Sequence, residues 1–296
     1  MAQTVVENLR AEAARIRKLL EELSANSSIR RWHNPHVDGF NYIGGHFAWN
    51  PLKDAGHQIQ AKVLEEYRRY YSTLRALLRE QPQVTIGKMV EADGSILEFI
   101  EQQGELYTAD RESYFKYADE ALESMTALLN RLYGEPDGRA VFVPDTNALI
   151  LNPALEKWRF DEAPQFSIIF TAPVLSELDS LKVNHRNEAV REKAEKVIRQ
   201  LKEYRRRAVA AGKRLADGVD LVSGISQVIT IATEPRMEES LPWLDPKNKD
   251  DQLLATVIEV MRMRPRSPVW LVTGDINLQN KAEYANVPFV EPPDPV

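Results

Sequence analysis

Two acidic residues in the second half of the sequence directly follow apolar segments that have the composition of β-strands. Asp145 comes after the run VFV at 141–143, and Asp275 comes at the end of VWLVTGD, after the run at 269–273. Both are therefore expected at the carboxyl ends of strands. In an open α/β sheet this edge is where ligands bind, because the loops that follow the strands converge there.

Two further acids lie near the expected starts of helices. Glu177 belongs to the segment TAPVLSELDSLK, in which Pro173 suits a first helical position. Asp250 belongs to NKDDQLLATVIEV, in which Asn248 is a candidate N-cap. We expect both carboxylates to project from early helical turns toward the same sheet edge as the first two acids.

Four carboxylates at one edge define a specific chemistry. Left unpaired they would repel one another, raise each other's pKa and destabilise the fold. A divalent cation removes that repulsion, and carboxylate oxygens favour Mg²⁺ or Mn²⁺. Such an ion keeps several waters, binds phosphate oxygens and polarises a water nucleophile, so phosphodiester hydrolysis is the expected reaction. One such acid alone would be read as an ordinary helix cap, but four in matching contexts favour a metal site.

The elements that must position these acids are short apolar runs alternating with helical segments. This alternation predicts an α/β fold in which a parallel sheet is sandwiched by helices. The runs with β-type composition are VFV at 141–143, FSIIF at 166–170, ISQVITIAT at 225–233, VWLVT at 269–273 and VPFV at 287–290.

The first half of the chain has a different pattern. Apolar residues at spacings of three and four predict amphipathic helices over 4–24, 57–79 and 109–133. The turn-forming cluster GEPDG at 134–138 then marks a junction. We therefore expect a mainly α-helical N-terminal domain at 1–138, which would be a substrate, regulatory or partner module. The α/β domain follows at 139–291, with a Pro-rich tail at 292–296.

Composition limits where the protein acts. The chain has no cysteine, which excludes disulfides, zinc–thiolate sites and cysteine nucleophiles, and a reducing compartment is the natural setting. No apolar run approaches the roughly 18 residues that a membrane span needs, and the first residues lack a signal peptide's apolar stretch. We expect a cytoplasmic protein without membrane association.

The formal net charge of −6 hides a strongly basic segment. Residues 186–214 hold 11 Lys or Arg and 4 Asp or Glu, a net +7, and read as one long helix followed by a loop. Spacings of four pair Glu192 with Lys196 and Glu195 with Arg199, which favours a solvated, salt-bridged face. Phosphate contact is the alternative.

Three consecutive arginines in this segment are its best candidates for contact with a nucleic-acid backbone, since Lys and Arg stripes supply most sequence-independent affinity. They are Arg205, Arg206 and Arg207. Of the three, only Arg207 has an acidic residue four positions before it, which is Glu203.

The segment 30–51 is rich in aromatic residues and contains His33, His36 and His46. Its aromatic members are Trp32, Phe40, Tyr42, Phe47 and Trp49. Packing against neighbouring helices is the favoured interpretation, and stacking on bases or contact with a partner is the alternative. The histidines are expected to be ordinary hydrogen-bonded residues.

The second half of the chain, roughly residues 139–291, resembles the PIN-domain nucleases. The resemblance lies in the segments VPDTNALI at 143–150, TAPVLSELDSLK at 171–182, KDDQLLATV at 249–257 and LVTGDINLQNKA at 271–282. It implies that Asp145 is the central metal ligand and that Glu177, Asp250 and Asp275 complete the catalytic, metal-binding site. Supporting roles around these acids are implied for Thr146, Asn147, Asp251 and Thr273.

The doublet Asp250–Asp251 leaves an ambiguity. Leu253 and Leu254 stand three and four residues after Asp250, which matches the apolar pair that follows the third acid of such domains. This spacing favours Asp250 as the ligand. Binding by Asp251 through a water is the alternative.

The resemblance implies a Mg²⁺- or Mn²⁺-dependent endonuclease, and RNA is the preferred substrate because most PIN domains cut RNA. A nuclease for single-stranded or flap DNA and a non-catalytic RNA-binding or scaffold protein are the alternatives. A toxin or defence role, a homo-oligomer and a protein partner that binds the N-terminal domain are compatible with the sequence.

Overall fold

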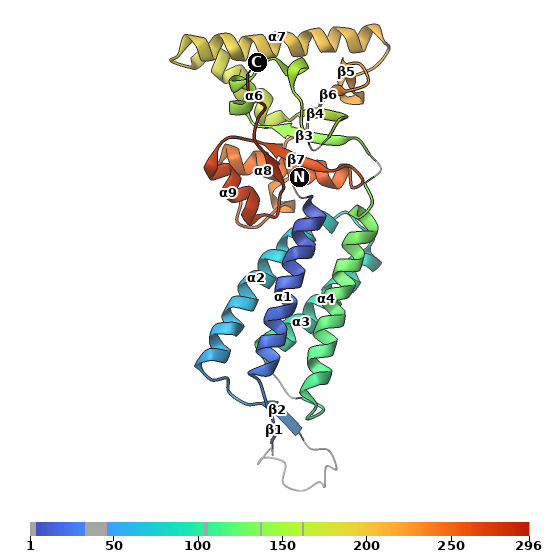
Figure 1. Cartoon of the computed structure of the whole chain (residues 1–296), viewed down its shortest axis with the longest axis vertical. Coiled ribbons are helices and arrows are strands. Elements are labelled where there is room, and N and C mark those ends of the chain that lie inside the picture. The colour runs from blue at the N-terminus through green and yellow to red at the C-terminus, as the bar shows by residue number, and fades with distance from the viewer. Residues whose placement is uncertain (1–3, 33–45, 104–105, 137, 162, 296) are drawn as a thin grey trace. The chain divides into compact units, whose positions relative to one another are not determined.

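A computed structural model describes residues 4–32, 46–103, 106–136, 138–161 and 163–295 (Figure 1). The chain divides into two compact units. The first, the helical unit, comprises residues 9–131, and the second, the α/β unit, comprises residues 132–296 together with the first residues of the chain up to Asn8. This division falls in the last turn of α4, and the limits 1–138, 139–291 and 292–296 stay a prediction.

The helical unit is built from long helices and one short pair of strands. Its elements are α1 (Val5–Ala25), β1 (Ile29–Trp32), β2 (His46–Trp49), α2 (Asp54–Leu78), α3 (Gln83–Glu101) and α4 (Arg111–Tyr133). Strands β1 and β2 pair antiparallel, with Ile29 opposite Trp49 and Trp32 opposite His46.

Polar contacts show how the helices pack. The Arg69 guanidinium of α2 lies 2.6 Å from Oε1 of Glu12, a fully buried carboxylate of α1. The Tyr67 hydroxyl of α2 donates to Oδ1 of Asp93 on α3 at 2.8 Å. Burial is the main reason that the pKa of Asp93 and that of Tyr67 are both raised. These contacts join helices whose apolar faces form the core of the unit.

The sequence predicted three of these helices and missed the rest. The expected segments 4–24, 57–79 and 109–133 are confirmed as α1, α2 and α4. Helix α3 was not predicted, because Gly87 and Gly94 are weak helix formers. In addition, Val84 and Val90 are exposed at positions where polar residues would be expected. The strands β1 and β2 were not predicted, because each has only four residues.

Part of the aromatic segment packs as expected. The Trp49 side chain is 7% exposed and makes edge contacts with Phe99 at 5.9 Å and Tyr114 at 5.8 Å between ring centroids. The packing interpretation is therefore confirmed for Trp49. Other residues named for this segment lie outside the described residues: His33, His36, Phe40 and Tyr42, and the side chains of Trp32 and His46.

The α/β unit contains a six-stranded sheet. Its strands are β3 (Ala140–Pro144), β4 (Phe166–Phe170), β5 (Val219–Val222), β6 (Ser226–Thr230), β7 (Val269–Val272) and β8 (Phe289–Val290). Its helices are α5 (Thr146–Leu151), α6 (Ala172–Asn184), α7 (Glu188–Ala210), α8 (Lys249–Met263) and α9 (Ile276–Tyr284). Short 3-10 turns are η1 (Leu155–Lys157), η2 (Leu215–Asp217) and η3 (Met237–Glu239).

The order of the strands is β5-β6-β4-β3-β7-β8, and every neighbouring pair is parallel except β5–β6. Within this sheet the chain forms β3 and then β4, next the edge strand β5 and its neighbour β6, and then crosses to β7 on the other side of β3. Figure 1 shows α6 and α7 on one side of the sheet and α8 and α9 on the other. The order therefore reverses between β3 and β7, the kind of switch point at which open α/β sheets bind ligands.

An aromatic cluster forms the core beside the central strand. Phe142 of β3 stacks on Phe160 at 3.6 Å and on Trp270 of β7 at 5.4 Å between ring centroids. Phe166 of β4 meets Phe142 edge-on. This packing fixes β3 against both neighbouring strands, so the residues that follow β3 and β7 have defined positions.

The predicted α/β architecture is confirmed, with one addition. The strand β5 was not predicted, because it is a short edge strand between Gly218 and Gly224, whose φ angles are +90° and +72°. The segment 186–214 is a long helix with a loop after it, as predicted, and α7 begins at an Asn187 cap. Glu195 and Arg199 form the expected pair at 3.2 Å.

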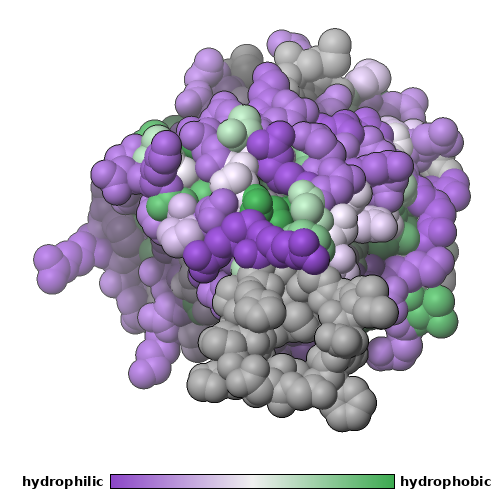
Figure 2. All heavy atoms as spheres, turned by 90° about the horizontal axis from the view of Figure 1, so that it is seen from below, coloured by the Kyte–Doolittle hydropathy of each residue, from purple (hydrophilic) through white to green (hydrophobic). Residues whose placement is uncertain are grey.

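The surface seen in Figure 2, from the end at which β1 and β2 lie, is mainly hydrophilic where it is coloured. Hydrophobic residues form small separate areas there, as is ordinary for protein surfaces. Among the helices of the described chain, none combines the length and the hydropathy needed to cross a membrane.

Candidate functional site

Asp145 lies at the carboxyl end of β3 and is 5% exposed. It is the N-cap of α5, and its Oδ1 accepts a hydrogen bond from the backbone N–H of Ala148 at 2.5 Å. Its own N–H donates to the carbonyl of Val272 at 3.0 Å, which ties it to β7. The side chain is therefore held at the switch point of the sheet.

Thr273 connects the two acids at this point. Its fully buried hydroxyl donates to Oδ2 of Asp145 at 2.5 Å and accepts from the backbone N–H of Asp275 at 3.0 Å. Asp275 is in turn the N-cap of α9, because its Oδ1 accepts from the N–H groups of Asn277 and Leu278. Both acids thus cap helices, as the more ordinary interpretation predicted, and both also face the same sheet edge.

Glu177 joins the site from α6. The hydroxyl of the buried Thr146 donates to Oε2 of Glu177 at 2.8 Å, which links the start of α5 to the second turn of α6. Asn147, the next residue of α5, is exposed. Thr146 and Thr273 are therefore the two hydroxyls that hold carboxylates of the site.

The acidic doublet at the start of α8 has two distinct environments. Asn248 caps the helix, as predicted, and its Oδ1 accepts from the N–H groups of Asp250 at 2.9 Å and Asp251 at 3.3 Å. Asp251 is buried, and it accepts from Lys281 Nζ at 2.6 Å and from the backbone N–H of Asp245 at 2.9 Å. Both Asp251 oxygens thus serve contacts within the fold, while Asp250 is half-buried beside them.

Neighbouring carboxylates act on the pKa of Asp145 and on that of Asp250. Burial raises the pKa of Asp145, hydrogen bonds from Thr273 and the Ala148 N–H oppose the rise, and the charges of Asp275 and Glu177 add to it. Burial also raises the pKa of Asp250; here the Lys281 charge opposes the rise, and Asp275 and Asp251 add to it. Asp145, Glu177, Asp250 and Asp275 therefore share one negative region.

The donor set of this region fits a divalent cation such as Mg²⁺ or Mn²⁺ in its chemistry. The side chains proposed as ligands offer carboxylate oxygens. Burial is the main cause of the raised pKa of Asp145 and that of Asp250, and neighbouring carboxylates add to both, a contribution that a cation would offset. In the described part of the chain, no three acidic or histidine side chains are grouped so that they could hold one ion as they stand. Asp145, for example, uses both oxygens in hydrogen bonds.

Two polar residues at the site were not predicted from the sequence. Lys281 brings a positive charge from α9, and the Gln279 side-chain amide donates to the carbonyl of Thr273 at 3.0 Å. Both belong to the segment INLQNKA that follows Asp275. The partner of Lys281 is on another helix, so no spacing within the sequence could reveal the contact.

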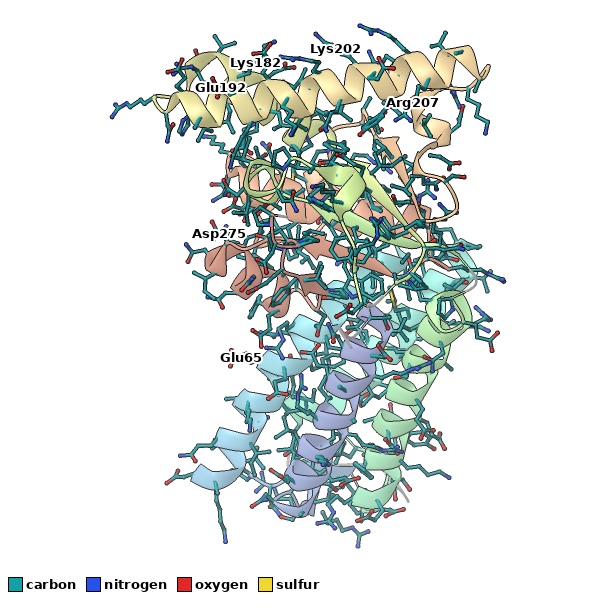
Figure 3. The ribbon with its side chains drawn as sticks, turned by 45° about the horizontal axis from the view of Figure 1, so that its top comes forward. Glu65, Lys182, Glu192, Lys202, Arg207 and Asp275 are labelled. Carbon is teal, nitrogen blue, oxygen red and sulfur yellow. The ribbon has the colours of Figure 1, made fainter. Side chains whose placement is uncertain are left out.

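The three arginines of α7 are exposed. Glu203 pairs with Arg206 at 3.1 Å, and not with Arg207, which stands four residues after it. The Arg207 guanidinium lies 4.7 Å from the centroid of the Tyr204 ring. Figure 3 shows Arg207 toward one end of α7, and Asp275 on the side of the unit where the other end of α7 lies.

Comparison with known proteins agrees with this geometry. The family model for the PIN domain matches residues 142–291, just over half of the chain. No curated protein matches the sequence. The matched region runs from the centre of β3 to the residue after β8 and so includes every predicted acid. The chain therefore belongs to the PIN-domain family, whose members are generally nucleases.

Proposed function

We propose that the protein is a metal-dependent endonuclease whose natural substrate is RNA. The observation that carries this proposal is the shared negative region at the switch point between β3 and β7. Asp145 and Asp250 have raised pKa values there, and the charge of Asp275 contributes to both. A carboxylate cluster of this kind at a ligand-binding sheet edge suits a phosphodiester substrate only if cations are present.

In this proposal Asp145, Glu177, Asp250 and Asp275 hold one or two Mg²⁺ or Mn²⁺ ions. When bound, such an ion lowers the pKa of a water and neutralises charge on the scissile phosphate. Thr273 and Thr146 orient Asp145 and Glu177 through the hydrogen bonds described above. Asn147 and Asp251 support the ligands without binding the ion.

The proposal assigns the two units different tasks. The PIN domain at 139–291 carries the chemistry, and the N-terminal domain at 1–138 selects the substrate or a partner. We prefer RNA over DNA as the substrate because the sequence resembles PIN domains, most of which cut RNA. The absence of cysteine supports a reducing compartment, and we place the activity in the cytoplasm.

The experiment that tests this function compares RNA ends. Wild type and Asp145→Asn are expressed in matched cells, and RNA ends that appear only with wild type identify cleavage sites. The purified proteins are then given those RNAs, single-stranded DNA and flap DNA, with Mn²⁺, Mg²⁺ or EDTA. Cleavage of RNA by wild type with metal supports the proposal. Cleavage of DNA alone would correct the substrate, and binding without any cleavage would favour a scaffold role.

Replacing Arg205, Arg206 and Arg207 together by Glu is expected to weaken RNA binding and to raise KM more than it lowers kcat. Metal ions held by the acids would neutralise only the scissile region, so flanking phosphates need a positive surface. Figure 3 shows Arg207 and Asp275 on opposite sides of the α/β unit, so the arginines would contact phosphates away from the scissile one. The slope of log K against log salt should flatten by about 0.7 for each phosphate that the variant no longer neutralises.

The matched control for this variant replaces the same three arginines by Lys. It keeps the charge and should bind RNA with nearly wild-type affinity and salt slope. Because Arg206 already pairs with Glu203, Arg205 and Arg207 should account for most of the loss of affinity. Equal affinities of the Glu variant and the wild type at every salt concentration would mean that α7 is a solvated face.

A further inference from the structure

An exposed pair of aromatic side chains lies on the PIN domain between two otherwise separate segments. Trp243, from the loop between η3 and α8, and Tyr284, from the last turn of α9, meet edge-to-face with ring centroids 5.3 Å apart. Their exposures are 38% and 45%. The other tryptophans whose side chains are described, Trp49, Trp158 and Trp270, are at most 7% exposed.

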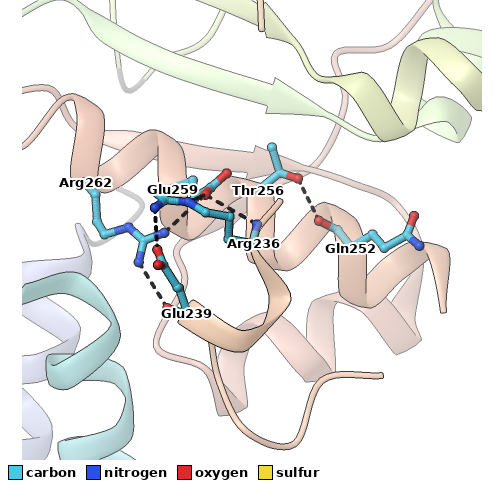
Figure 4. Close-up of polar contacts among 6 residues, drawn as sticks. All are labelled: Arg236, Glu239, Gln252, Thr256, Glu259 and Arg262. Atoms are coloured by element: carbon cyan, nitrogen blue, oxygen red, sulfur yellow. Dashed lines mark hydrogen bonds and ion pairs between the residues drawn. The ribbon is translucent and has the colours of Figure 1, made fainter. Parts of the chain in front are cut away.

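The loop that carries Trp243 is held in place by ion pairs to α8 (Figure 4). Arg236 lies 2.9 Å from Glu239 and 3.4 Å from Glu259 of α8. Arg262 of α8 is 3.4 Å from Glu259 and donates to the carbonyl of Glu239 at 3.1 Å. These contacts anchor residues 236–239, the start of the segment that leads to Trp243, and the ring of Trp243 itself is held by its edge contact with Tyr284.

The residues after Trp243 connect the pair to the acidic site. The backbone N–H of Asp245 donates to Asp251, and Asp251 also holds Lys281. Lys281 lies one turn before Tyr284 on α9, and its charge acts on Asp250. Since α9 begins at the Asp275 cap and has nine residues, Tyr284 is roughly 13 Å along the helix axis from that acid.

We propose that Trp243 and Tyr284 form a stacking surface for an unpaired base of the nucleic-acid strand that the acidic site cuts. The inference rests on the proposed function and adds a residue-level account of how the strand is held. Aromatic rings of this kind bind bases of any sequence, provided that the bases are not already stacked in a duplex. A base inside a duplex cannot present its face to the pair unless the duplex is opened there.

The charged residues beside the pair are of both signs, with Asp245 and Glu283 exposed next to the two rings and two exposed lysines between the pair and Asp250. Lys247 and Lys249 are exposed between Trp243 and Asp250, at the start of α8, whereas Lys281 is already paired with Asp251. A strand whose phosphate lies at the acids would pass the two exposed ammonium groups, which suit a backbone phosphate. The next bases along the strand would then reach Trp243 and Tyr284.

The test measures binding without cleavage, so that it does not depend on catalysis. A labelled oligouridylate is titrated with wild type, Trp243→Ala and Tyr284→Ala in Ca²⁺ in place of Mg²⁺ or Mn²⁺, so that the carboxylate charge is offset. Kd is read from fluorescence anisotropy, and the oligouridylate is checked to be intact after the titration. Each alanine variant is expected to bind about tenfold more weakly. Tyr284→Phe, which keeps the ring, should bind like wild type. Val209→Ala, at a 69% exposed apolar side chain of α7, is the matched control and should change nothing.

A second readout distinguishes stacking from a general loss of folding. Single nucleotides of the oligouridylate are replaced in turn by an abasic residue. Wild type should lose affinity at one or two adjacent positions only, and Trp243→Ala should lose that position dependence while its Tm stays near wild type. A blunt RNA duplex should bind wild type and both alanine variants equally.

The results separate this inference from the nuclease proposal. Wild-type affinity for the oligouridylate in both alanine variants would overturn the stacking surface, even if metal-dependent cleavage is intact. So would an equal loss of affinity for oligouridylate and duplex. A position-dependent loss in a protein that cuts no nucleic acid would instead uphold the stacking surface and overturn the catalytic proposal.

Discussion

Asp145→Asn is expected to lower metal-dependent cleavage by about 10³-fold, because an ion contact contributes several kcal/mol to transition-state stabilisation and each ~1.4 kcal/mol is a factor of ten. The fold should persist. Asn keeps an oxygen that can accept from the Ala148 N–H, and its amide can donate to the Thr273 hydroxyl, which also has acceptor capacity. Single-turnover cleavage of RNA with saturating Mn²⁺ measures the effect.

The same variant should stabilise the metal-free protein. The pKa of Asp145 is raised above its ordinary value of 3.8, so the folded state binds this proton more tightly than the unfolded state does. Ionisation of Asp145 therefore lowers the free energy of unfolding as the pH rises from about 4 through the raised pKa. The protein remains destabilised by this amount at neutral pH. Urea unfolding in EDTA should show Asp145→Asn to be more stable than wild type at pH 7, and the difference should vanish at low pH.

Metal should reverse this order. Mn²⁺ binds the native state, so it should raise the Tm of wild type and have little effect on Asp145→Asn. Asp179→Asn is the matched control, since it removes an exposed carboxylate of the same helix as Glu177 without touching the site. If Asp145→Asn cuts RNA as wild type does, the assignment of Asp145 is wrong.

The sequence could predict the candidate site because its signals are local. Asp145 and Asp275 each follow an apolar run and each cap the next helix, and both features are properties of a few consecutive residues. The parallel sheet then brings such positions together, whatever the details of packing. The architecture followed for the same reason, since the buried strands β3, β4 and β7 have nearly uninterrupted apolar sequences.

What the sequence could not predict depends on contacts between distant segments. The hydrogen bond from Thr273 to Asp145 joins residues 128 positions apart, and that from Lys281 to Asp251 joins residues 30 apart. Helix α3 depends on burial of one face against its neighbours, which overrides the weak propensity of its glycines. The aromatic pair of Trp243 and Tyr284 likewise required a structure, because the two residues belong to different segments.

The doublet Asp250–Asp251 gives the second large expected effect. Replacing Asp251 should lower the stability of the fold, whereas replacing Asp250 should lower the rate of cleavage. Asp251→Asn breaks a mostly buried pair with Lys281, whose side chain is 29% exposed, and weakens the contact to Asp245. Breaking such a pair should cost about 2–3 kcal/mol of folding free energy. For a unit of this size that is a fall in Tm of roughly 4–12 °C.

Asp250→Asn should behave differently, since Asp250 is only half-buried and its burial already disfavours its charge. Its Tm in EDTA should equal or exceed that of wild type, while cleavage falls by about 10²–10³-fold. Lys281→Met supplies the control for the pair. The double variant Asp251→Asn/Lys281→Met should be less destabilised than the sum of the single variants, because each single change leaves one partner buried and unpaired.

If Asp251→Asn kept full stability and lost activity, whereas Asp250→Asn stayed active, the two acids would have to exchange roles. The ion pair of Asp251 argues against this exchange, because the Lys281 ammonium 2.6 Å from its Oδ1 would repel a divalent ion, whereas Asp145 accepts only uncharged donors.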